Sequence, residues 1–309
     1  MKRKNNLYKD IYNIDNIIKV TNEVCRNTKN KRKVNKFKEY KCIYISKIYN
    51  ELKNKEYKVG TYNVFTIYEP KERRIVSQNV YDKIVNHLVA RYILMPALIP
   101  CLIDTNVASR KGLGTSAGYK YFKDFSRICK IKYKEYYILK CDIRKFFASI
   151  DKQILKNKIE KRIKDKDALK IVYDIIDSEE NGIGIGNMTS QIFAIYYLND
   201  LDHYIKEKLK IKYYVRYQDD FLLFHTSKEY LKECFIKIKE FLKTENLELN
   251  SKSRLYKNSN NFIFLGKDNK GRIYKNRKIK KHINKKYYMY KTKQIKLNSL
   301  VSTINCSKK

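Results

Sequence analysis

Three aspartates have the residue type and the surroundings that phosphoryl-transfer chemistry needs. Asp142 ends an apolar, β-branched segment that begins at Tyr136, and the pair Asp219–Asp220 lies between two further apolar segments. Asp is a common turn former, so a pair of Asp residues at a turn is a weak signal when it stands alone. Here the expected turn is short and lacks glycine, and two carboxylates at a hairpin tip repel each other unless a cation neutralises them.

A third acid at the end of another buried strand would complete a metal site. Two divalent ions about 3.5–4 Å apart can stabilise the attacking and leaving oxygens of an in-line displacement. Carboxylates suit hard cations, so we expect two Mg²⁺ ions, with Mn²⁺ as a possible substitute. The four histidines are isolated in the sequence, and no P-loop, HExxH or GxSxG motif competes.

The charge of the chain indicates a polyanionic partner. The 309 residues carry 69 Lys and Arg against 32 Asp and Glu, a formal net charge of +37. An AT-rich coding sequence would also enrich Lys over Arg, but it would not explain the shortage of acids. Nucleic acid is therefore the favoured partner. With 43% hydrophobic residues, the chain should fold as one large domain or two intertwined ones.

Cysteine spacing and the N-terminal sequence bear on the compartment. The seven cysteines are scattered, without a CxxC pair or histidines at zinc spacing. The first ten residues lack the apolar run of a signal peptide. No uninterrupted run of about 18 apolar residues occurs, so we expect no membrane contact and a cytoplasmic protein.

Hydrophobic periodicity and turn residues predict alternating helical and extended segments. In the N-terminal half we expect helices over 1–54, a hairpin over 61–80 with its turn at Pro70–Arg74, a helix over 81–99, a loop over 104–118 and a helix from about Tyr119. Further on we expect strands over 136–142, 211–217, 221–224 and 262–265, helices over 153–178, 189–209 and 228–243, a glycine loop over 182–186, and a basic, helix-prone tail over 270–309.

Several ordered motifs resemble those of reverse transcriptases. YQDD between apolar strands resembles the YxDD motif of that family, and CDIRKFFASI resembles its first aspartate motif. The segments GIGIGNMTSQIFAIYYLNDLDHYI, LELNSKSRL and NFIFLG resemble the loop–helix motif, the motif with a basic residue near the triphosphate, and the primer grip. Upstream, FTIYEPKERRIV and ASRKGLGTSAG resemble fingers motifs of bacterial reverse transcriptases. The resemblance covers about residues 1–270, in the right order.

This resemblance implies an α+β fold of the right-hand polymerase type. The fingers and an N-terminal extension would occupy 1–135. The palm, an antiparallel sheet plus helices, would occupy 136–266 with a helical insertion near 153–181. A short, basic, helical thumb would follow over 267–309. The implied activity is RNA-directed DNA polymerisation with an RNA template, a DNA or RNA primer and deoxynucleoside triphosphates, and without an RNase H domain.

The resemblance also assigns roles to individual residues. The implied catalytic and metal-binding set comprises Asp142, Asp219, Asp220 and the backbone carbonyl of Ile143. The implied nucleotide-binding set comprises Arg73, Arg74, Phe147, Ile185, Gly186, Gln191 and Lys252. The implied template and primer set comprises Lys71, Arg110, Ser190, Tyr217, Gln218, Phe264, Leu265 and Gly266. Within these sets Phe147 would exclude a 2′-hydroxyl, while Phe146 belongs to the core.

The segment from Ile185 to Gln191, IGNMTSQ, looks like the corresponding motif of diversity-generating retroelement reverse transcriptases. That subfamily makes frequent errors at adenines and works with a small basic accessory protein. Gln218 and Gly184 depart from its usual pattern. Phage-defence and other solo reverse transcriptases share much of the motif. Two further alternatives are a non-catalytic RNA-binding protein with a polymerase fold and an RNA-templated RNA polymerase, against which Phe147 argues.

Overall fold

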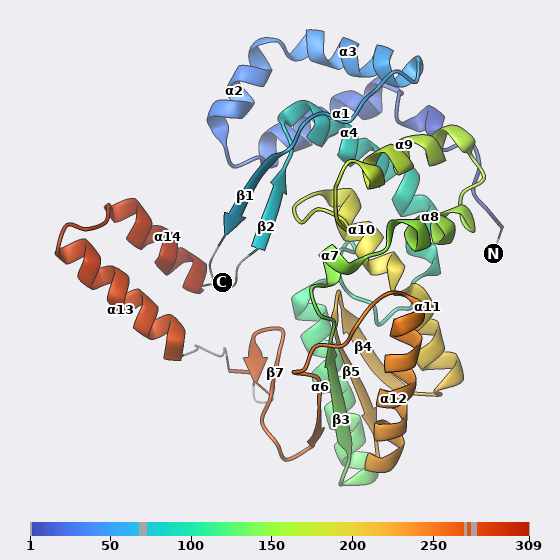
Figure 1. Cartoon of the computed structure of the whole chain (residues 1–309), viewed down its shortest axis with the longest axis vertical. Helices are drawn as coiled ribbons and strands as arrows, with labels where there is room; N and C mark the ends of the chain where they lie inside the picture. The colour runs from blue at the N-terminus through green and yellow to red at the C-terminus, as the bar shows by residue number, and fades with distance from the viewer. Residues whose placement is uncertain (1, 68–72, 269–270, 273–276, 309) are drawn as a thin grey trace. The chain divides into compact units, whose positions relative to one another are not determined.

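An antiparallel sheet with strand order β4-β5-β3-β6 joins the two segments that carry the aspartates (Figure 1). Its strands are β3 (Tyr137–Asp142), β4 (Tyr213–Tyr217), β5 (Asp220–His225) and β6 (Arg254–Lys257). This computed structural model describes residues 2–67, 73–268, 271–272 and 277–308. Strand β6, which the hydrophobic pattern did not predict, pairs with β3 through a register that aligns Leu139 with Leu255.

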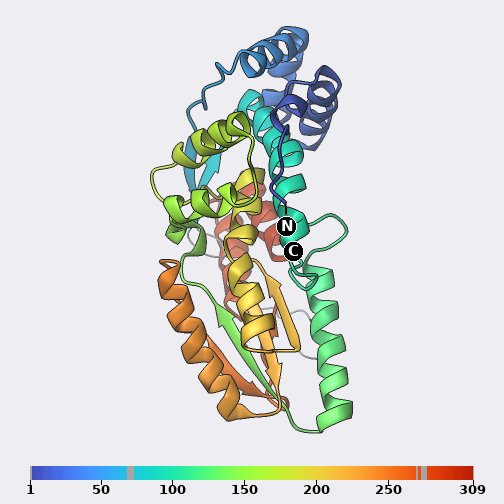
Figure 2. The same ribbon diagram turned by 90° about the vertical axis from the view of Figure 1, so that its right-hand side faces the viewer.

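The two faces of the sheet differ because side chains alternate along each strand. Leu139, Cys141, Phe221 and Leu223 share the face that joins the main core, and α12 (Lys228–Thr244) packs against these strands. The other face carries Asp142 and Asp220 at one end and Phe224 at the opposite end. Helix α6 (Thr115–Tyr133) covers that far end, so the sheet lies between α12 and α6 (Figure 2).

Aromatic rings join α6 to the end of the sheet that is distant from the aspartates. The rings of Phe122 and Phe125 lie 6.2 and 5.9 Å, centroid to centroid, from the ring of Phe224. Phe125 also contacts Tyr213 of β4, with centroids 5.4 Å apart. These contacts hold α6 against the end of the sheet that is distant from Asp220.

Asparagine caps set the starts of the N-terminal helices. Asn13, Asn30 and Asn79 each accept a hydrogen bond from a backbone N–H of the first turn, at α1, α2 and α4 respectively. The elements of this region are η1 (Tyr8–Asp10), α1 (Ile14–Asn27), α2 (Lys31–Glu39), α3 (Lys41–Lys53), β1 (Asn63–Ile67), β2 (Arg73–Ser77) and α4 (Val80–Val89). The helices expected over 1–54 and the hairpin over 61–80 are therefore present.

Helix α4 continues through a π-helical turn into a long, mostly apolar stretch. The continuing elements are η2 (Ala90–Leu94), α5 (Met95–Leu98) and η3 (Ile99–Cys101). Val80–Cys101 is the one stretch among the described residues that is long and apolar enough to cross a membrane by length and composition. The helix expected over 81–99 is present, but a stretch of this length and apolar composition was not expected. More than half of its most apolar window is buried in the protein, where α4 packs against α1 and α10.

The central helix α10 (Met188–Tyr197) is buried along nearly its whole length. The single helix expected over 189–209 is instead broken at Leu198, where ψ is 9°. Helix α11 (Asn199–His203) and the π-helical turn η4 (Tyr204–Lys208) follow. The segment between β3 and α10 contains α7 (Phe146–Ser149), α8 (Lys152–Glu160) and α9 (Lys166–Asp177), as the expected helical insertion requires.

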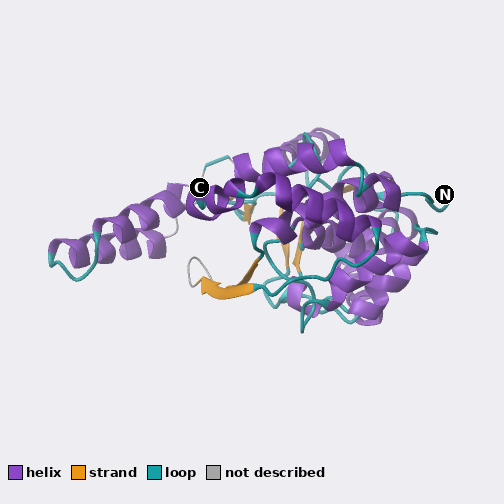
Figure 3. Cartoon of the chain, turned by 90° about the horizontal axis from the view of Figure 1, so that it is seen from above, coloured by secondary structure: helices purple, strands orange, loops and turns teal. Residues whose placement is uncertain are grey.

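Residues 259–309 form a unit separate from 1–258. It contains the short hairpin of β7 (Ile263–Phe264) and β8 (Lys267–Asp268), then α13 (Arg277–Lys291) and α14 (Leu297–Lys308). The two helices lie side by side as a helical hairpin (Figure 3). The helix-prone tail is thus confirmed, while the division into fingers, palm and thumb at 135 and 266 stays a prediction.

Three element boundaries were predicted wrongly. Helix α6 begins at Thr115 rather than near Tyr119, so Gly118 lies inside a helix. Arg73 and Arg74 belong to strand β2 instead of the hairpin turn. Asp220 is the first residue of β5 and not part of the turn before it. Local residue preferences define such boundaries poorly because strand pairing extends the ladder to the last residue that finds a partner.

Candidate active site

The Asp219–Asp220 pair lies at a two-residue connection between β4 and β5. Tyr217 pairs directly with Asp220, which leaves only Gln218 and Asp219 in the turn. Gln218 adopts a left-handed conformation with φ of 56°. Non-glycine residues take this conformation at a cost, and they do so where the surrounding structure imposes it.

Asp142 and Asp220 face each other across neighbouring strands. They are Cα partners in the β3–β5 ladder, and alternation places both side chains on the same face. Lys140, two residues before Asp142, lies on that face too and bonds Oδ2 of Asp220 through its Nζ at 3.1 Å. The side chains of Lys140 and Asp220 are 20% and 23% exposed.

The carboxyl of Asp220 is only partly neutralised. Burial raises its pKa from 3.8 to about 6, Lys140 acts against this shift, and the negative charges of Asp142 and Asp219 add to it. Its Oδ1 is buried without a hydrogen-bond partner in the structure. A buried carboxylate oxygen of this kind beside a second carboxylate fits a site for a hard cation.

The three acids do not form a compact ligand set as they stand. In the parts of the chain that the structure describes, no three His, Cys, Asp or Glu side chains lie close enough together to hold a metal ion. The donor chemistry fits Mg²⁺, with Asp142 and Asp220 in register and Asp219 adjacent in sequence. The full set of three carboxylates stays a prediction.

The loop after α12 supports the end of β3. The backbone N–H of Asn250 donates to the carbonyl of Asp142 at 2.7 Å, and the N–H of Asp142 donates to Oγ of Ser253 at 3.2 Å. Ile143, predicted to offer its carbonyl to a metal, is buried and forms a bridge with Leu249. Lys252 lies exposed in the same turn, between Asn250 and Ser253, the two residues that bond the backbone of Asp142.

The two phenylalanines after Asp142 have different environments. Phe146 is 2% exposed and belongs to the core, whereas Phe147 is half-buried. Their rings meet edge to face with centroids 5.8 Å apart. The core role of Phe146 is confirmed, and Phe147 has the partial exposure that contact with a sugar requires.

The glycine loop before α10 is joined to the hairpin β1–β2. The N–H of Val76 donates to the carbonyl of Ile185 at 3.0 Å, and Ile75 forms a parallel bridge with Ile185. Gly186 has φ of 128°, and a Cβ there would lie 2.8 Å from the carbonyl oxygen of Val76. Glycine is therefore required, but the backbone it approaches in this structure is that of β2.

Arg74 of this hairpin has an acidic neighbour. Its Nη1 lies 3.8 Å from Oε2 of Glu179, while half of the Arg74 side chain remains exposed. Glu179 is 6% exposed, and burial raises the pKa of its carboxyl. Arg73 is exposed as well, so both arginines can reach a ligand. Lys71, the third predicted basic contact, lies outside the described residues.

The start of α10 is connected to the loop before α6. Ser190 is buried, and the exposed Gln191 accepts a hydrogen bond from Oγ of Ser109 at 3.2 Å. Oγ of Ser109 in turn accepts one from Nε2 of Gln218 at 3.0 Å. Gln191 and Gln218, predicted separately for nucleotide and template contacts, thus belong to one chain of hydrogen bonds.

Arg110 is held by its own loop. Its Nη1 donates to the carbonyls of Ile103 and Asn106, both at 2.9 Å. This guanidinium nitrogen stabilises the loop, and the contact of Arg110 with template or primer stays a prediction.

The predicted primer-grip residues form a tight hairpin. Phe264 pairs with Lys267, and the intervening Leu265 and Gly266 have φ of 51° and 79°. Phe264 is fully buried, Leu265 is half-buried and Gly266 is exposed. The hairpin expected at NFIFLG is therefore present within the unit 259–309.

Sequence reasoning missed several residues that support the site. Lys140 could have been found, because strand alternation puts it on the face of Asp142. Asn86 could not. It donates to Oγ1 of Thr189 at 2.9 Å, and its Oδ1 accepts from the N–H of Thr189 at 3.2 Å. It thereby caps α10 from α4, a contact that only the fold creates.

Comparison with known proteins agrees with this architecture. The family model described as reverse transcriptase (RNA-dependent DNA polymerase) matches residues 68–268, more than half of the chain. A search of curated proteins gave no match.

Three telomerase structures are similar to this chain. The telomerase of Candida tropicalis, in complex with a TWJ fragment of telomeric RNA, has a TM-score of 0.55 at 15% identity, over 72% of this chain and 47% of that chain. An apo form truncated from its C-terminal domain has a TM-score of 0.53 at 17% identity, over 67% and 52%. The telomerase of Candida albicans, also with telomeric RNA, has a TM-score of 0.50 at 13% identity, over 66% and 43%.

At such low identities these similarities concern the fold alone, and the chain spans about half the length of the telomerases. They agree with a polymerase fold of mixed helices and antiparallel sheet. The match of the family model over residues 68–268 shows that the chain belongs to the reverse transcriptase family.

Proposed function

We propose that the protein is an RNA-directed DNA polymerase whose catalytic carboxylates are Asp142, Asp219 and Asp220. The observation that carries the proposal is the in-register pairing of Asp142 with Asp220, next to a turn that holds Asp219. Oδ1 of Asp220 is buried without a hydrogen-bond partner in the structure. Membership of the reverse transcriptase family supports the same chemistry.

The three aspartates, with the carbonyl of Ile143, would hold two Mg²⁺ ions. Bound there, these ions would neutralise charge on the attacking and leaving oxygens. The chain itself contributes orientation. Lys140 fixes Oδ2 of Asp220, and Asn250 and Ser253 fix the backbone of Asp142.

Nucleotide contacts would come from two sides. Arg73 and Arg74 extend from β2 and could bind the triphosphate. Phe147 would lie beneath the sugar and exclude a 2′-hydroxyl. The link from Val76 to Ile185 keeps the hairpin next to the glycine loop, so both parts of the nucleotide pocket would move together.

An RNA template is supported by charge and by similarity. The net charge of +37 favours a polyanion, and two of the similar telomerase structures contain telomeric RNA. The rival function of a non-catalytic RNA-binding protein would need no paired carboxylates. The rival function of an RNA polymerase would not need a large ring at Phe147.

We further propose that the enzyme works in a diversity-generating retroelement, with a small basic accessory protein as partner. The support is the IGNMTSQ segment, in which Ile185 stands before Gly186. An apolar side chain there cannot donate the hydrogen bond that a glutamine amide would give to an incoming nucleotide. A role in phage defence is the alternative for the same segment.

Asp219→Ala should abolish DNA synthesis on a primed RNA template while leaving the protein folded. Loss of a metal ligand removes several kcal/mol of transition-state stabilisation, so the rate should fall by roughly three orders of magnitude. Primer extension with Mg²⁺ measures it. The matched control is Asp15→Asn, which removes an exposed carboxylate of α1. Extension by the Asp219 variant at the wild-type rate would contradict the proposal.

Asp220→Asn should stabilise the metal-free protein at pH 7.5. The pKa of Asp220 in the folded state, about 6, exceeds the ordinary 3.8. The contribution of this carboxyl to the free energy of unfolding is therefore highest below pH 4, where it is protonated, and falls as pH rises through 6. The cost at neutral pH is about 1 to 3 kcal/mol. Urea unfolding in EDTA at pH 7.5 and pH 4 measures the free energy of unfolding of both proteins. The extra stability of Asp220→Asn should vanish at pH 4. A variant less stable than wild type at pH 7.5 would show that Asp220 is not strained there.

Phe147→Val should raise incorporation of ribonucleotides relative to deoxynucleotides, because a smaller side chain admits the 2′-hydroxyl. Competition between the two nucleotide types in primer extension measures the preference. Phe125→Val is the control, since it shortens a half-buried ring at the far end of the sheet. An equal change in both variants would mean that Phe147 acts only through packing.

Errors in the cDNA should concentrate at template adenines, and Ile185→Gln should reduce them. Each 1.4 kcal/mol or so of restored discrimination is worth about tenfold in fidelity. Sequencing cDNA copied from a defined RNA measures this, with Ile185→Leu as a control that adds no amide. Equal error rates at all four bases would argue against the retroelement role. If errors still concentrate at adenines in Ile185→Gln, the proposed role of Ile185 is wrong, but the retroelement role is not contradicted.

A further inference from the structure

A buried arginine lies directly beneath the Asp219–Asp220 turn. Arg216 is on β4, two residues before Gln218, and alternation points its side chain away from the face that carries Asp220. Both Arg216 and Asp202 of α11 are 0% exposed, which makes this a fully buried ion pair. Buried charges of this kind are uncommon unless they are completely paired.

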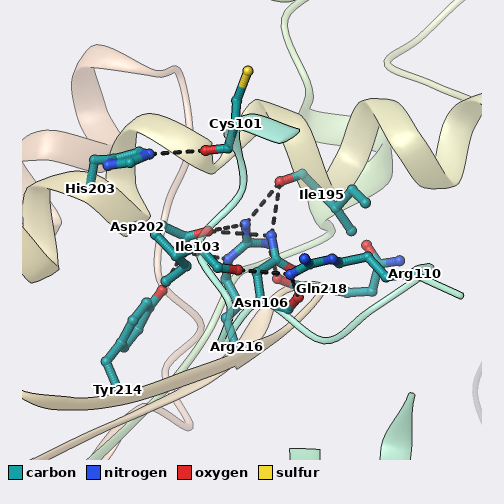
Figure 4. Close-up of polar contacts among 10 residues, drawn as sticks. All are labelled: Cys101, Ile103, Asn106, Arg110, Ile195, Asp202, His203, Tyr214, Arg216 and Gln218. Atoms are coloured by element: carbon teal, nitrogen blue, oxygen red, sulfur yellow. Dashed lines mark hydrogen bonds and ion pairs between the residues drawn. The ribbon is translucent and has the colours of Figure 1, made fainter. Parts of the chain in front are cut away.

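The guanidinium of Arg216 has partners on three separate segments (Figure 4). Its Nε and Nη2 donate to the two carboxylate oxygens of Asp202, at 2.7 and 2.5 Å. Nη2 also donates to the carbonyl of Ile195, near the end of α10, at 2.9 Å. Nη1 donates to the carbonyl of Gln218, in the catalytic turn, at 2.9 Å. One planar group therefore connects α11, α10 and the turn.

Asp202 is itself fixed from other directions. The hydroxyl of Tyr214 donates to its Oδ1 at 2.6 Å, and Nδ2 of Asn106 donates to its Oδ2 at 3.4 Å. The backbone of Arg216 also pairs with the loop before α6, with its N–H on the carbonyl of Thr105 and its carbonyl on the N–H of Val107. These bonds hold both Asp202 and the backbone of Arg216, and so they fix the guanidinium where it bonds the turn.

This arrangement costs free energy that packing alone would not require. Removing two charges from water is expensive, and well-packed apolar residues often replace such pairs without loss of stability. An apolar pair could not, however, donate to the carbonyl of Gln218. That carbonyl belongs to the residue with φ of 56°, whose backbone conformation sets where Asp219 and Asp220 point.

We propose that Arg216 is a positioning residue that fixes the carbonyl of Gln218 and thereby the Asp219–Asp220 carboxylates, with Asp202 as its anchor. The inference rests on the proposed polymerase activity. The bond from Nε2 of Gln218 to Ser109 holds the same residue from its side chain, so the turn is fastened at two points.

The decisive comparison is between Arg216→Lys and Tyr214→Phe. Lysine keeps the charge opposite Asp202, but its single nitrogen cannot occupy the separate positions of Nε, Nη1 and Nη2 that bond Asp202 and Gln218. Tyr214→Phe removes a buried hydrogen bond from the same carboxylate without touching the turn. We expect kcat for primer extension to fall on the order of 10- to 100-fold in Arg216→Lys and little in Tyr214→Phe.

Two further readouts separate positioning from general destabilisation. The Mg²⁺ concentration for half-maximal rate should rise in Arg216→Lys and not in Tyr214→Phe, at temperatures where both are folded. Binding of Mn²⁺ followed by electron paramagnetic resonance, without nucleotide or primer, should weaken in the same variant only. Equal kcat and equal Mn²⁺ affinity in the two variants would overturn the proposal.

The double variant Arg216→Leu with Asp202→Leu addresses the case in which Arg216→Lys fails to fold. Because both charges are removed together, no unpaired charge remains buried. A folded double variant with reduced kcat and weak Mn²⁺ binding supports the proposal, and one with wild-type values overturns it. Wild-type protein that extends no primer would instead contradict the polymerase function, which keeps the two failures distinguishable.

Discussion

The candidate active site depends on the repulsion between two carboxylates that the fold holds on paired strands. Asp142 and Asp220 are opposite one another on paired strands, and Lys140 neutralises only one oxygen of the second acid. Burial raises the pKa of Asp220 to about 6, which means that the unneutralised site is strained at neutral pH. In the proposed polymerase site, cations that relieve this strain would be held where the reacting phosphate would lie.

The sheet alone could not hold two like charges together. The backbone N–H of Asn250, from a segment distant in sequence, bonds the carbonyl of Asp142. The side chain of Arg216, which is anchored on Asp202, bonds the carbonyl of Gln218. The apolar face beneath, with Cys141 and Phe221 fully buried, provides the free energy that offsets the electrostatic cost. The proposed active site thus lies at one end of the two central strands, β3 and β5.

Helix α10 connects this end of the sheet to the N-terminal hairpin. Its first turn is capped by Asn86, and the loop before it carries Ile185, which pairs with Val76 of β2. A shift of the hairpin would therefore displace the glycine loop. The proposed contacts of Arg74 and Gly186 with one nucleotide are compatible with that coupling.

The sequence alone determined the parts of this protein that local pattern encodes. Apolar and β-branched runs predicted β3 and the strands around Asp219–Asp220. The spacing of apolar residues predicted the N-terminal helices, and the ordered motifs indicated the reverse transcriptase family. Phe146 was correctly assigned to the core, since an aromatic residue beside a strand end is usually buried.

Only the tertiary structure decided how the motifs meet. Strand β6 is short and weakly apolar, so its pairing with β3 could not be foreseen. The buried ion pair of Arg216 and Asp202 joins β4 to α11, and no sequence motif predicted it. Gly186 was expected to approach a ligand, yet its close neighbour is the carbonyl of Val76. Such contacts join segments far apart in the chain, and residue preferences, which act over a few neighbours, carry no information about them.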